Sequence, residues 1–164
     1  MLKELCFNVN IFMFHVEHKN KNGDSMNEKF MNMAYDEAKK SYELKEIPVG
    51  CVIVKDNLVI SKAHNCKEKY KNAIMHAELL AVDKACKKNK DWRLDDCELY
   101  TTLEPCMMCM GAIIESRIKK IYYGTKNKNE QMYDINCKHI SIINLNDLRC
   151  SEILSDFFKN RRKI

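Results

Sequence analysis

The sequence reads HAE at residues 76–78 and PCMMC at residues 105–109. These stretches supply an imidazole from His76, a carboxylate from Glu78, and thiols from Cys106 and Cys109. An imidazole and two thiolates suit zinc in both softness and tetrahedral geometry. Three such ligands are one fewer than a closed structural zinc site uses. We therefore expect an open fourth position that can hold a water molecule.

Both motifs fall where a helix is expected to begin, because apolar residues recur at helical spacing over 76–88 and 106–116. His76 and Glu78 lie two residues apart, so both can face one cavity only in the first turn of a helix. Cys106 and Cys109 lie three apart and share a helix face, and the positive end of the helix dipole favours their thiolate forms. Glu78 has the chemistry to accept a proton from a metal-bound water and to pass it to a leaving amine.

Each motif alone has a simpler interpretation. A C-x-x-C pair in a small intracellular protein is often a redox or structural pair, and H-x-E is commoner still. Together, in this order and each after an expected strand, they favour a catalytic metal site. The other cysteines, and two histidines, are more typical of buried or incidental residues than of ligands: Cys6, Cys51, Cys66, Cys86, Cys97, Cys137, Cys150, His64 and His139.

Composition limits the class of protein. A chain of 164 residues with 46% hydrophobic residues predicts one domain with a sizeable core. The formal net charge of +5 is a mild preference for anionic partners such as nucleic acid. Nine cysteines, an odd number, favour a reducing compartment over a secreted disulfide scaffold. No apolar run approaches the length of about 20 residues that a membrane span needs.

The first 25 residues are expected to lie outside the domain. Most of residues 7–16 are apolar, but polar side chains interrupt the run and no small-residue cleavage site follows. The segment therefore makes a poor signal peptide. Residues 19–25 are typical of a polar linker, and Met26 opens a clean helical pattern. We therefore expect a domain over 26–164, preceded by a non-native or disordered extension over 1–25.

Hydrophobic periodicity predicts an α/β fold with a mixed sheet flanked by helices. A hairpin with a turn at 55–57 is expected to join the first two strands, and a further helix is expected before the last strand. The expected helices span 26–44, 76–88, 106–116 and 148–163, and the expected strands span 49–54, 58–63, 98–102, 119–123 and 139–143.

The pattern H-x-E followed by P-C-x-x-C is the signature of zinc-dependent nucleobase deaminases. From Met26 to Ile164 the sequence further resembles the bacterial tRNA-specific adenosine deaminases. That resemblance implies the cytidine-deaminase-like three-layer sandwich with a five-stranded sheet, and a cytoplasmic homodimer that converts the wobble adenosine of a tRNA anticodon to inosine. The segments that carry it are 47–50, 63–65, 76–79, 100–106, 111–112, 116–118 and 154–159.

The same resemblance implies a role for individual side chains. One Zn²⁺ per subunit would be bound by His76, Cys106 and Cys109, with Glu78 as the proton shuttle. Asn65 would hydrogen-bond the purine, and Ile47 and Val49 would line the base pocket. Phe157 and Phe158, on the last helix, would contact the anticodon loop.

The physics of RNA recognition agrees with these roles, since a target base must leave its loop and be held by stacking and polar contacts. Cations near the C-terminus could contact phosphates, or could simply be a solvated helix end that complements the dipole. A second cluster of basic residues has the same two interpretations, and for this cluster a solvated helix face is favoured over contact with phosphates. The two clusters are Lys159, Arg161, Arg162 and Lys163, and Lys84, Lys87, Lys88 and Lys90.

One segment departs from the family pattern. Residues 125–131 contain no glycine, and Asn127 stands roughly where the family has an aspartate. Because this loop touches RNA in the family, we expect Asn127→Asp to change the preference for RNA over DNA. Two other functions stay open: a deaminase of a free base or nucleoside such as guanine or cytosine, and a non-catalytic zinc-containing RNA-binding subunit. Glu78 argues against the latter, because a structural zinc site has no use for it.

Overall fold

A five-stranded sheet forms the middle of the molecule in the computed structural model, which describes residues 21–128 and 139–162. The strands lie in the order β2-β1-β3-β4-β5. Strand β1 is antiparallel to β2 and β3, whereas β3, β4 and β5 are parallel to one another. The predicted mixed sheet is therefore confirmed. The strands are β1 (Gly50–Lys55), β2 (Leu58–His64), β3 (Cys97–Leu103), β4 (Lys120–Thr125) and β5 (Ser141–Asn144).

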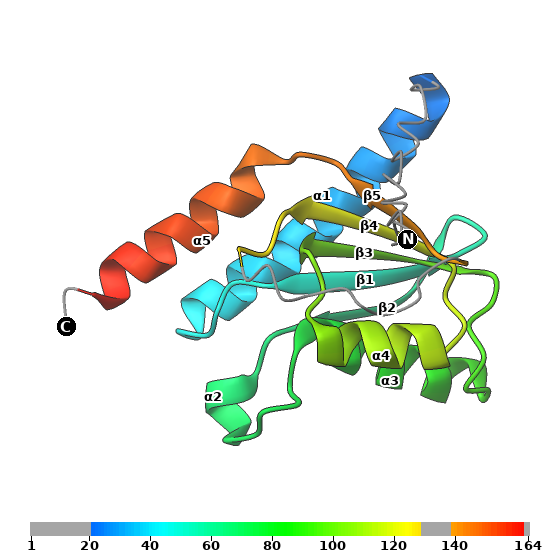
Figure 1. The fold of residues 1–164 in the computed structure, drawn as a ribbon, viewed down its shortest axis with the longest axis horizontal. Helices are drawn as coiled ribbons and strands as arrows, with labels where there is room; N and C mark the ends of the chain where they lie inside the picture. Colours follow the sequence, from blue (N-terminus) through cyan, green and yellow to red (C-terminus); the bar gives the residue numbers. More distant parts are fainter. Residues whose placement is uncertain (1–20, 129–138, 163–164) are drawn as a thin grey trace, which may run out of the picture.

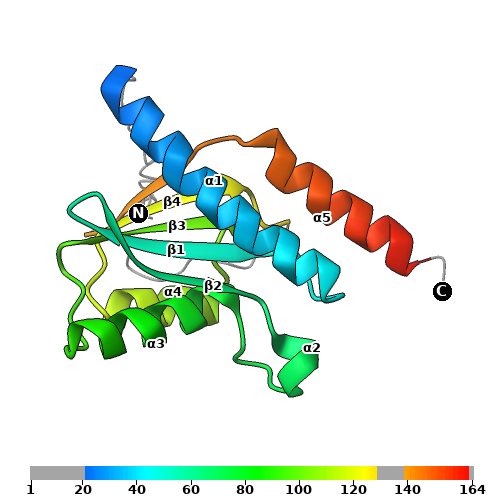
Figure 2. The ribbon, with the colours of Figure 1, turned by 180° about the vertical axis from the view of Figure 1, so that it is seen from behind.

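Helices cover both faces of this sheet, which confirms the three-layer sandwich (Figures 1 and 2). Helices α1 (Lys21–Glu43) and α5 (Leu148–Arg161) lie on one face. Helices α3 (Ala77–Asn89) and α4 (Met107–Glu115) lie on the other, preceded by the four-residue helix α2 (Lys67–Tyr70). Among the described residues, no helix is both long and apolar enough to span a membrane.

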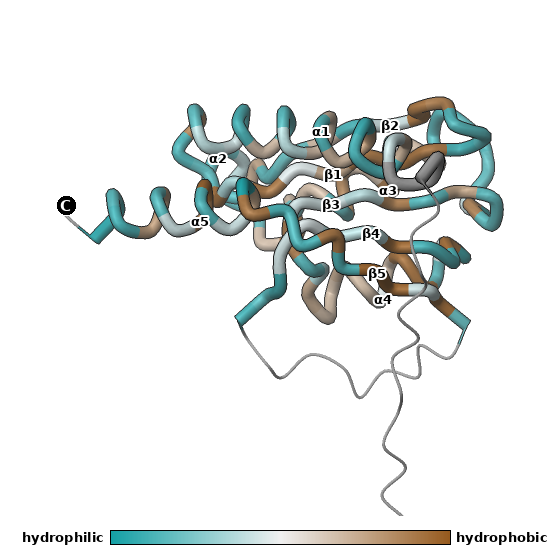
Figure 3. Tube along the Cα trace, turned by 90° about the horizontal axis from the view of Figure 1, so that it is seen from above, coloured by the Kyte–Doolittle hydropathy of each residue, from teal (hydrophilic) through white to brown (hydrophobic). Residues whose placement is uncertain are grey.

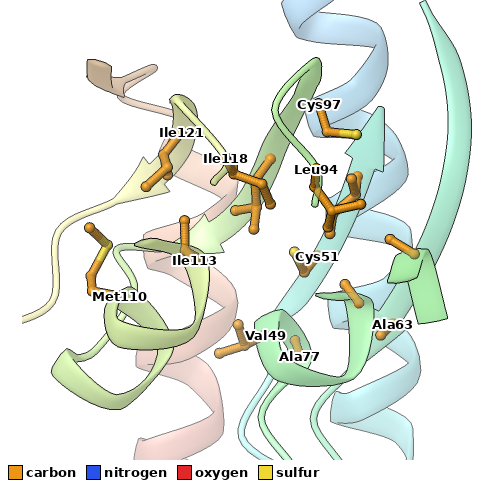
Figure 4. Close-up of a cluster of buried hydrophobic side chains, with 14 residues drawn as sticks. Val49, Cys51, Ala63, Ala77, Leu94, Cys97, Met110, Ile113, Ile118 and Ile121 are labelled. Atoms are coloured by element: carbon orange, nitrogen blue, oxygen red, sulfur yellow. The ribbon is translucent and has the colours of Figure 1, made fainter. Parts of the chain in front are cut away.

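The sheet separates two apolar clusters because alternate strand residues point to opposite faces. Cys51 and Ile53 face α3 and α4, in the cluster shown in Figure 4. Val52 and Val54 face α1, in a second cluster where the rings of Tyr100 and Tyr122 stack at 4.6 Å. Hydrophilic residues dominate the outer turns of α1 and α5 (Figure 3), as expected for helices with one solvated face.

Most predicted elements are present within one to three residues of their expected bounds. The hairpin is confirmed, and Asp56 and Asn57 at its tip both have positive φ, as a two-residue turn between twisted strands requires. The helix expected before β5 falls on 129–138, outside the described residues; 126–128 and 139–140 are not helical. Residues 1–20 also lie outside them, so the extension over 1–25 stays a prediction.

Two predictions of local structure are wrong. Residues 21–25, expected as linker, belong to α1. Residues 25–29 are not buried, so apolar spacing does not reveal the turns of α1 that precede Phe30. Helix α2 was not expected, because none of its residues is buried and it has no apolar period.

Gly50 is the point where α1 lies directly on the sheet. A Cβ at this position would stand 2.0 Å from the Ala34 carbonyl oxygen and 2.4 Å from the Ala38 backbone nitrogen. Both neighbours are main-chain atoms of α1, which cannot rotate away as a flexible side chain can. Helix α1 and strand β1 therefore pack backbone against backbone.

We expect Gly50→Ala to destabilise the fold by about 2–3 kcal/mol, because the added methyl must push α1 off the sheet. The midpoint of urea unfolding measures this. Gly111→Ala is the matched control, since nothing lies within 4 Å of a Cβ there and alanine is a better helix former by about 0.5–1 kcal/mol. Equal midpoints for the two variants would contradict the close packing.

Candidate active site

Two helices begin at the same end of the sheet, where the parallel strands end (Figure 1). His76 is the N-cap residue of α3, and Cys106 is the N-cap residue of α4, both with extended backbone. Pro105 precedes the N-cap residue Cys106 and so lies outside the helical turns of α4. Its ring therefore helps to fix the chain that enters α4 rather than the turn itself.

The three expected ligand atoms form a nearly equilateral triangle. His76 Nδ1 lies 3.7 Å from Cys106 Sγ and 3.6 Å from Cys109 Sγ, and the two sulfurs are 3.6 Å apart. A tetrahedral zinc ion with ordinary bond lengths would place two sulfurs about 3.8 Å apart, and a sulfur and a nitrogen about 3.6 Å apart. The side chains thus fit a tetrahedral metal without rearrangement. Among the described residues this is the one group of His, Cys, Asp and Glu so arranged.

Hydrogen bonds shift the pKa values of the two thiols in opposite directions. The Cys109 thiol and the His76 imidazole lower the pKa of Cys106 to about 4. The bond to Cys106, together with burial, raises the pKa of Cys109. The same contact with Cys106 raises the pKa of His76. A bound cation would deprotonate both thiols.

Glu78 lies beside this triangle, in the first turn of α3 with its side chain 4% exposed. Its Oε2 is 3.5 Å from Cys109 Sγ, and its Oε1 accepts a hydrogen bond from Thr101 Oγ1 at 3.3 Å. Burial raises the pKa of Glu78. A carboxyl group that protonates more readily than usual is suited to accept a proton and release it again.

Asn65 connects the end of β2 to the start of α3. Its Oδ1 accepts the backbone N–H of Ala77 at 2.9 Å, which is one of the N–H groups that a helix start cannot satisfy internally. Because the oxygen is engaged, the amide nitrogen is the part of this side chain that is left to contact a ligand. Val49, whose carbonyl accepts the Asn65 N–H, is buried, and Ile47 is partly buried against the same cluster.

The two phenylalanines of α5 differ in surroundings. Phe157 is 7% exposed and packs edge-on against Tyr42 at 6.0 Å, so it belongs to the junction of α1 and α5. Phe158 is 42% exposed. Of the two rings, Phe158 presents the more open aromatic surface, and the contact of both rings with RNA stays a prediction.

Several side chains near the site escaped sequence reasoning. Thr101 orients Glu78, and buried Glu46 accepts the backbone N–H groups of Glu68 and Lys69 and so holds α2 beside the site. Neither shows a pattern, since each is a single polar residue among apolar neighbours. Arg161, on α5, lies 3.7 Å from Glu68 and links the two exposed helices.

The described residues that were expected to be incidental do not belong to the triangle. His64 pairs with Glu37 at 3.0 Å. The other described cysteines are free thiols outside the metal group, and Cys6 and Cys137 are outside the described residues. On α3, Lys87 pairs with Asp83, as on a solvated helix face.

The Asn127 backbone N–H donates to the Glu104 carboxylate at 3.1 Å, next to Pro105.

Comparison with known proteins is consistent with this geometry. The model of the MafB19-like deaminase family matches residues 25–162. The chain is 39% identical to the tRNA-specific adenosine deaminase of Aquifex aeolicus over 153 residues, covering 82% of this chain and 95% of the relative. It is 36% identical to the Bacillus subtilis protein of the same name over 151 residues, covering 85% and 92%.

Two solved structures extend the comparison. One, from a study of A-to-I editing by tRNA:A34 deaminases at the wobble position, has a TM-score of 0.72 and 32% identity, covering 77% of this chain and 99% of its own. The other, a guanine deaminase from Bacillus subtilis, has a TM-score of 0.58 and 40% identity, covering 60% and 64%.

We expect Asn65→Ala to destabilise the protein by about 1–2 kcal/mol, because the Ala77 N–H at the start of α3 loses its acceptor. Asn65→Asp keeps an acceptor oxygen in the same place and should retain more of the stability. Thermal unfolding of the metal-free proteins measures both. If the alanine variant unfolds at or above the temperature of the aspartate variant, the hydrogen bond does not hold α3.

Proposed function

This chain belongs to the MafB19-like deaminase family, and from that premise we propose that it hydrolyses the wobble adenosine of a tRNA anticodon to inosine. The observation that carries the proposal is the triangle of His76, Cys106 and Cys109 with the buried carboxylate of Glu78 beside it. The similarity to tRNA-specific adenosine deaminases along most of both chains supports the substrate.

Zn²⁺ is the cofactor that we propose for the triangle, one ion per subunit, and when bound it would supply a water of lowered pKa. Glu78, beside the triangle, would accept a proton there and donate it to the departing amine. The balanced reaction consumes adenosine and water and yields inosine and ammonia. Thr101 keeps the carboxylate of Glu78 aimed at the site through its hydroxyl.

The base would be held by groups at the edge of the site. We propose that the Asn65 amide nitrogen donates to a ring nitrogen of the purine, while Ile47 and Val49 form the apolar wall behind Asn65. Phe158 offers an exposed ring for stacking. Two exposed cations follow it in the chain, Lys159 in the last turn of α5 and the C-cap residue Arg162, and we propose that they contact phosphates.

The assembly and the location are also proposals. A homodimer in the cytoplasm agrees with the family resemblance and with a chain whose described cysteines are all free. The substrate partner would be the anticodon stem-loop of tRNA.

The main alternative is deamination of a free base. It has specific support, because the chain is 40% identical to a guanine deaminase over 60% of its length. Inosine formation at position 34 of a tRNA, assayed beside ammonia release from guanine, separates the two. If the enzyme releases ammonia from guanine and forms no inosine in tRNA, deamination of a free base replaces our proposal. Zinc and tRNA binding without any turnover would instead indicate a non-catalytic RNA-binding subunit.

We expect Glu78→Gln to bind about one zinc per chain and to lose roughly 10²–10⁴-fold in the rate of inosine formation, because the amide cannot shuttle a proton. Metal content by atomic emission and single-turnover kinetics on tRNA measure the two properties. Cys109→Ser is the matched control, which should lower zinc content as well as rate. A Glu78→Gln enzyme of near wild-type rate would refute the assigned role.

A further inference from the structure

A second hollow lies at the far end of α4 from the metal ligands, with a volume of about 520 Å³. Three cationic side chains line it: Arg93 from the chain between α3 and β3, and Arg117 and Lys119 from the chain between α4 and β4. Ile118 and Ile140 give it an apolar side. The volume falls in the range of small-molecule sites, about 300–1,000 Å³.

Some basic groups of the fold are already paired with a carboxylate. Lys39, Lys87 and Arg149 each lie within 2.7 Å of a carboxylate oxygen. Within residues 21–128 and 139–162, by contrast, no ion pair within 4.0 Å involves Arg93, Arg117 or Lys119. Asp95 and His139 also line the hollow, so three cations face one carboxylate there. The excess positive charge is one that a bound anion would neutralise.

Trp92 holds two of these groups in place. The Arg93 and Arg117 guanidinium carbons lie 5.1 Å and 5.9 Å from the centroid of its ring, and the ring is 50% exposed. Arg117 reaches this position with a left-handed backbone, φ 68°, which is unusual for a residue with a side chain. Stacked guanidinium groups with free N–H donors match the geometry of phosphate.

We propose that this hollow binds a phosphate group of a nucleic acid or nucleotide, separately from the adenosine at the metal site. Helix α4 has nine residues and is therefore about 13 Å long, so one nucleotide at the metal site would not fill both places. The phosphate belongs either to the backbone of the same tRNA outside the anticodon loop or to a free nucleotide. If the phosphate belongs to tRNA, the inference rests on the proposed function. If it belongs to a free nucleotide, it does not.

The test removes two charges from the hollow and leaves the metal site intact. Arg93 and Lys119 are exposed, so Arg93→Gln/Lys119→Gln should fold normally. Lys29→Gln/Lys39→Gln removes the same charge from the opposite face, on α1, and is the matched control. The zinc-loaded proteins are titrated with full-length tRNA, with its isolated anticodon stem-loop, and with UMP, which has no purine for the metal site. Binding is followed by fluorescence anisotropy for the RNAs and by calorimetry for UMP.

We expect the hollow variant, but not the control, to bind one of the probes at least tenfold more weakly. A loss with tRNA alone, together with a decrease of about 2 in the salt dependence of log K, identifies backbone phosphates outside the stem-loop. A loss with UMP identifies a free nucleotide. Unchanged binding of all three probes, or an equal loss in the control, overturns the proposal. Since no turnover is measured, these outcomes are independent of whether tRNA yields inosine.

Discussion

The parallel pairing of β3 with β4 is the constraint on which the site depends. Parallel neighbours cannot be joined by a tight turn, so the chain must cross over through a helix, here α4, that starts where β3 ends. Helix α3 begins at the same edge. Two helix N-termini thus meet over the ends of the strands, and the residues that cap them, His76 and Cys106, become neighbours although far apart in sequence.

A buried polar framework keeps that meeting point rigid. Ser41 donates to the carbonyl oxygens of Val49 and Asn65, Asn65 accepts from Ala77, and Thr101 donates to Glu78. In the described part of the chain, no buried side-chain nitrogen or oxygen lacks a hydrogen-bond partner. Unsatisfied polar groups would cost about 1–3 kcal/mol each. The polar residues around the ligands are consequently part of the fold as well as of the site.

Sequence patterns predicted those parts of the molecule that repeat or that carry chemistry. The strands and long helices follow from apolar periods, and the grouping of His76, Cys106 and Cys109 follows from two motifs whose residue types suit a metal site. What failed was carried by single residues. Glu46 and helix α2 have no apolar period, and the different burial of Phe157 and Phe158 depends on which side of α5 each ring occupies. Neighbours distant in sequence decide each of these, so local patterns cannot.

Asn65 illustrates a consequence for how such a site can diverge. Its oxygen is committed to the start of α3, so the side chain can neither flip nor be exchanged for a shorter residue without disturbing the helix that carries the metal ligand. A substitution at this position that improves the binding of a new substrate would therefore also cost stability at the start of α3. Substitutions that change binding are instead expected at residues that do not also hold the fold together, on the exposed rim formed by α2 and the end of α5. This one hydrogen bond therefore favours related proteins that keep the centre of the site and differ at its rim.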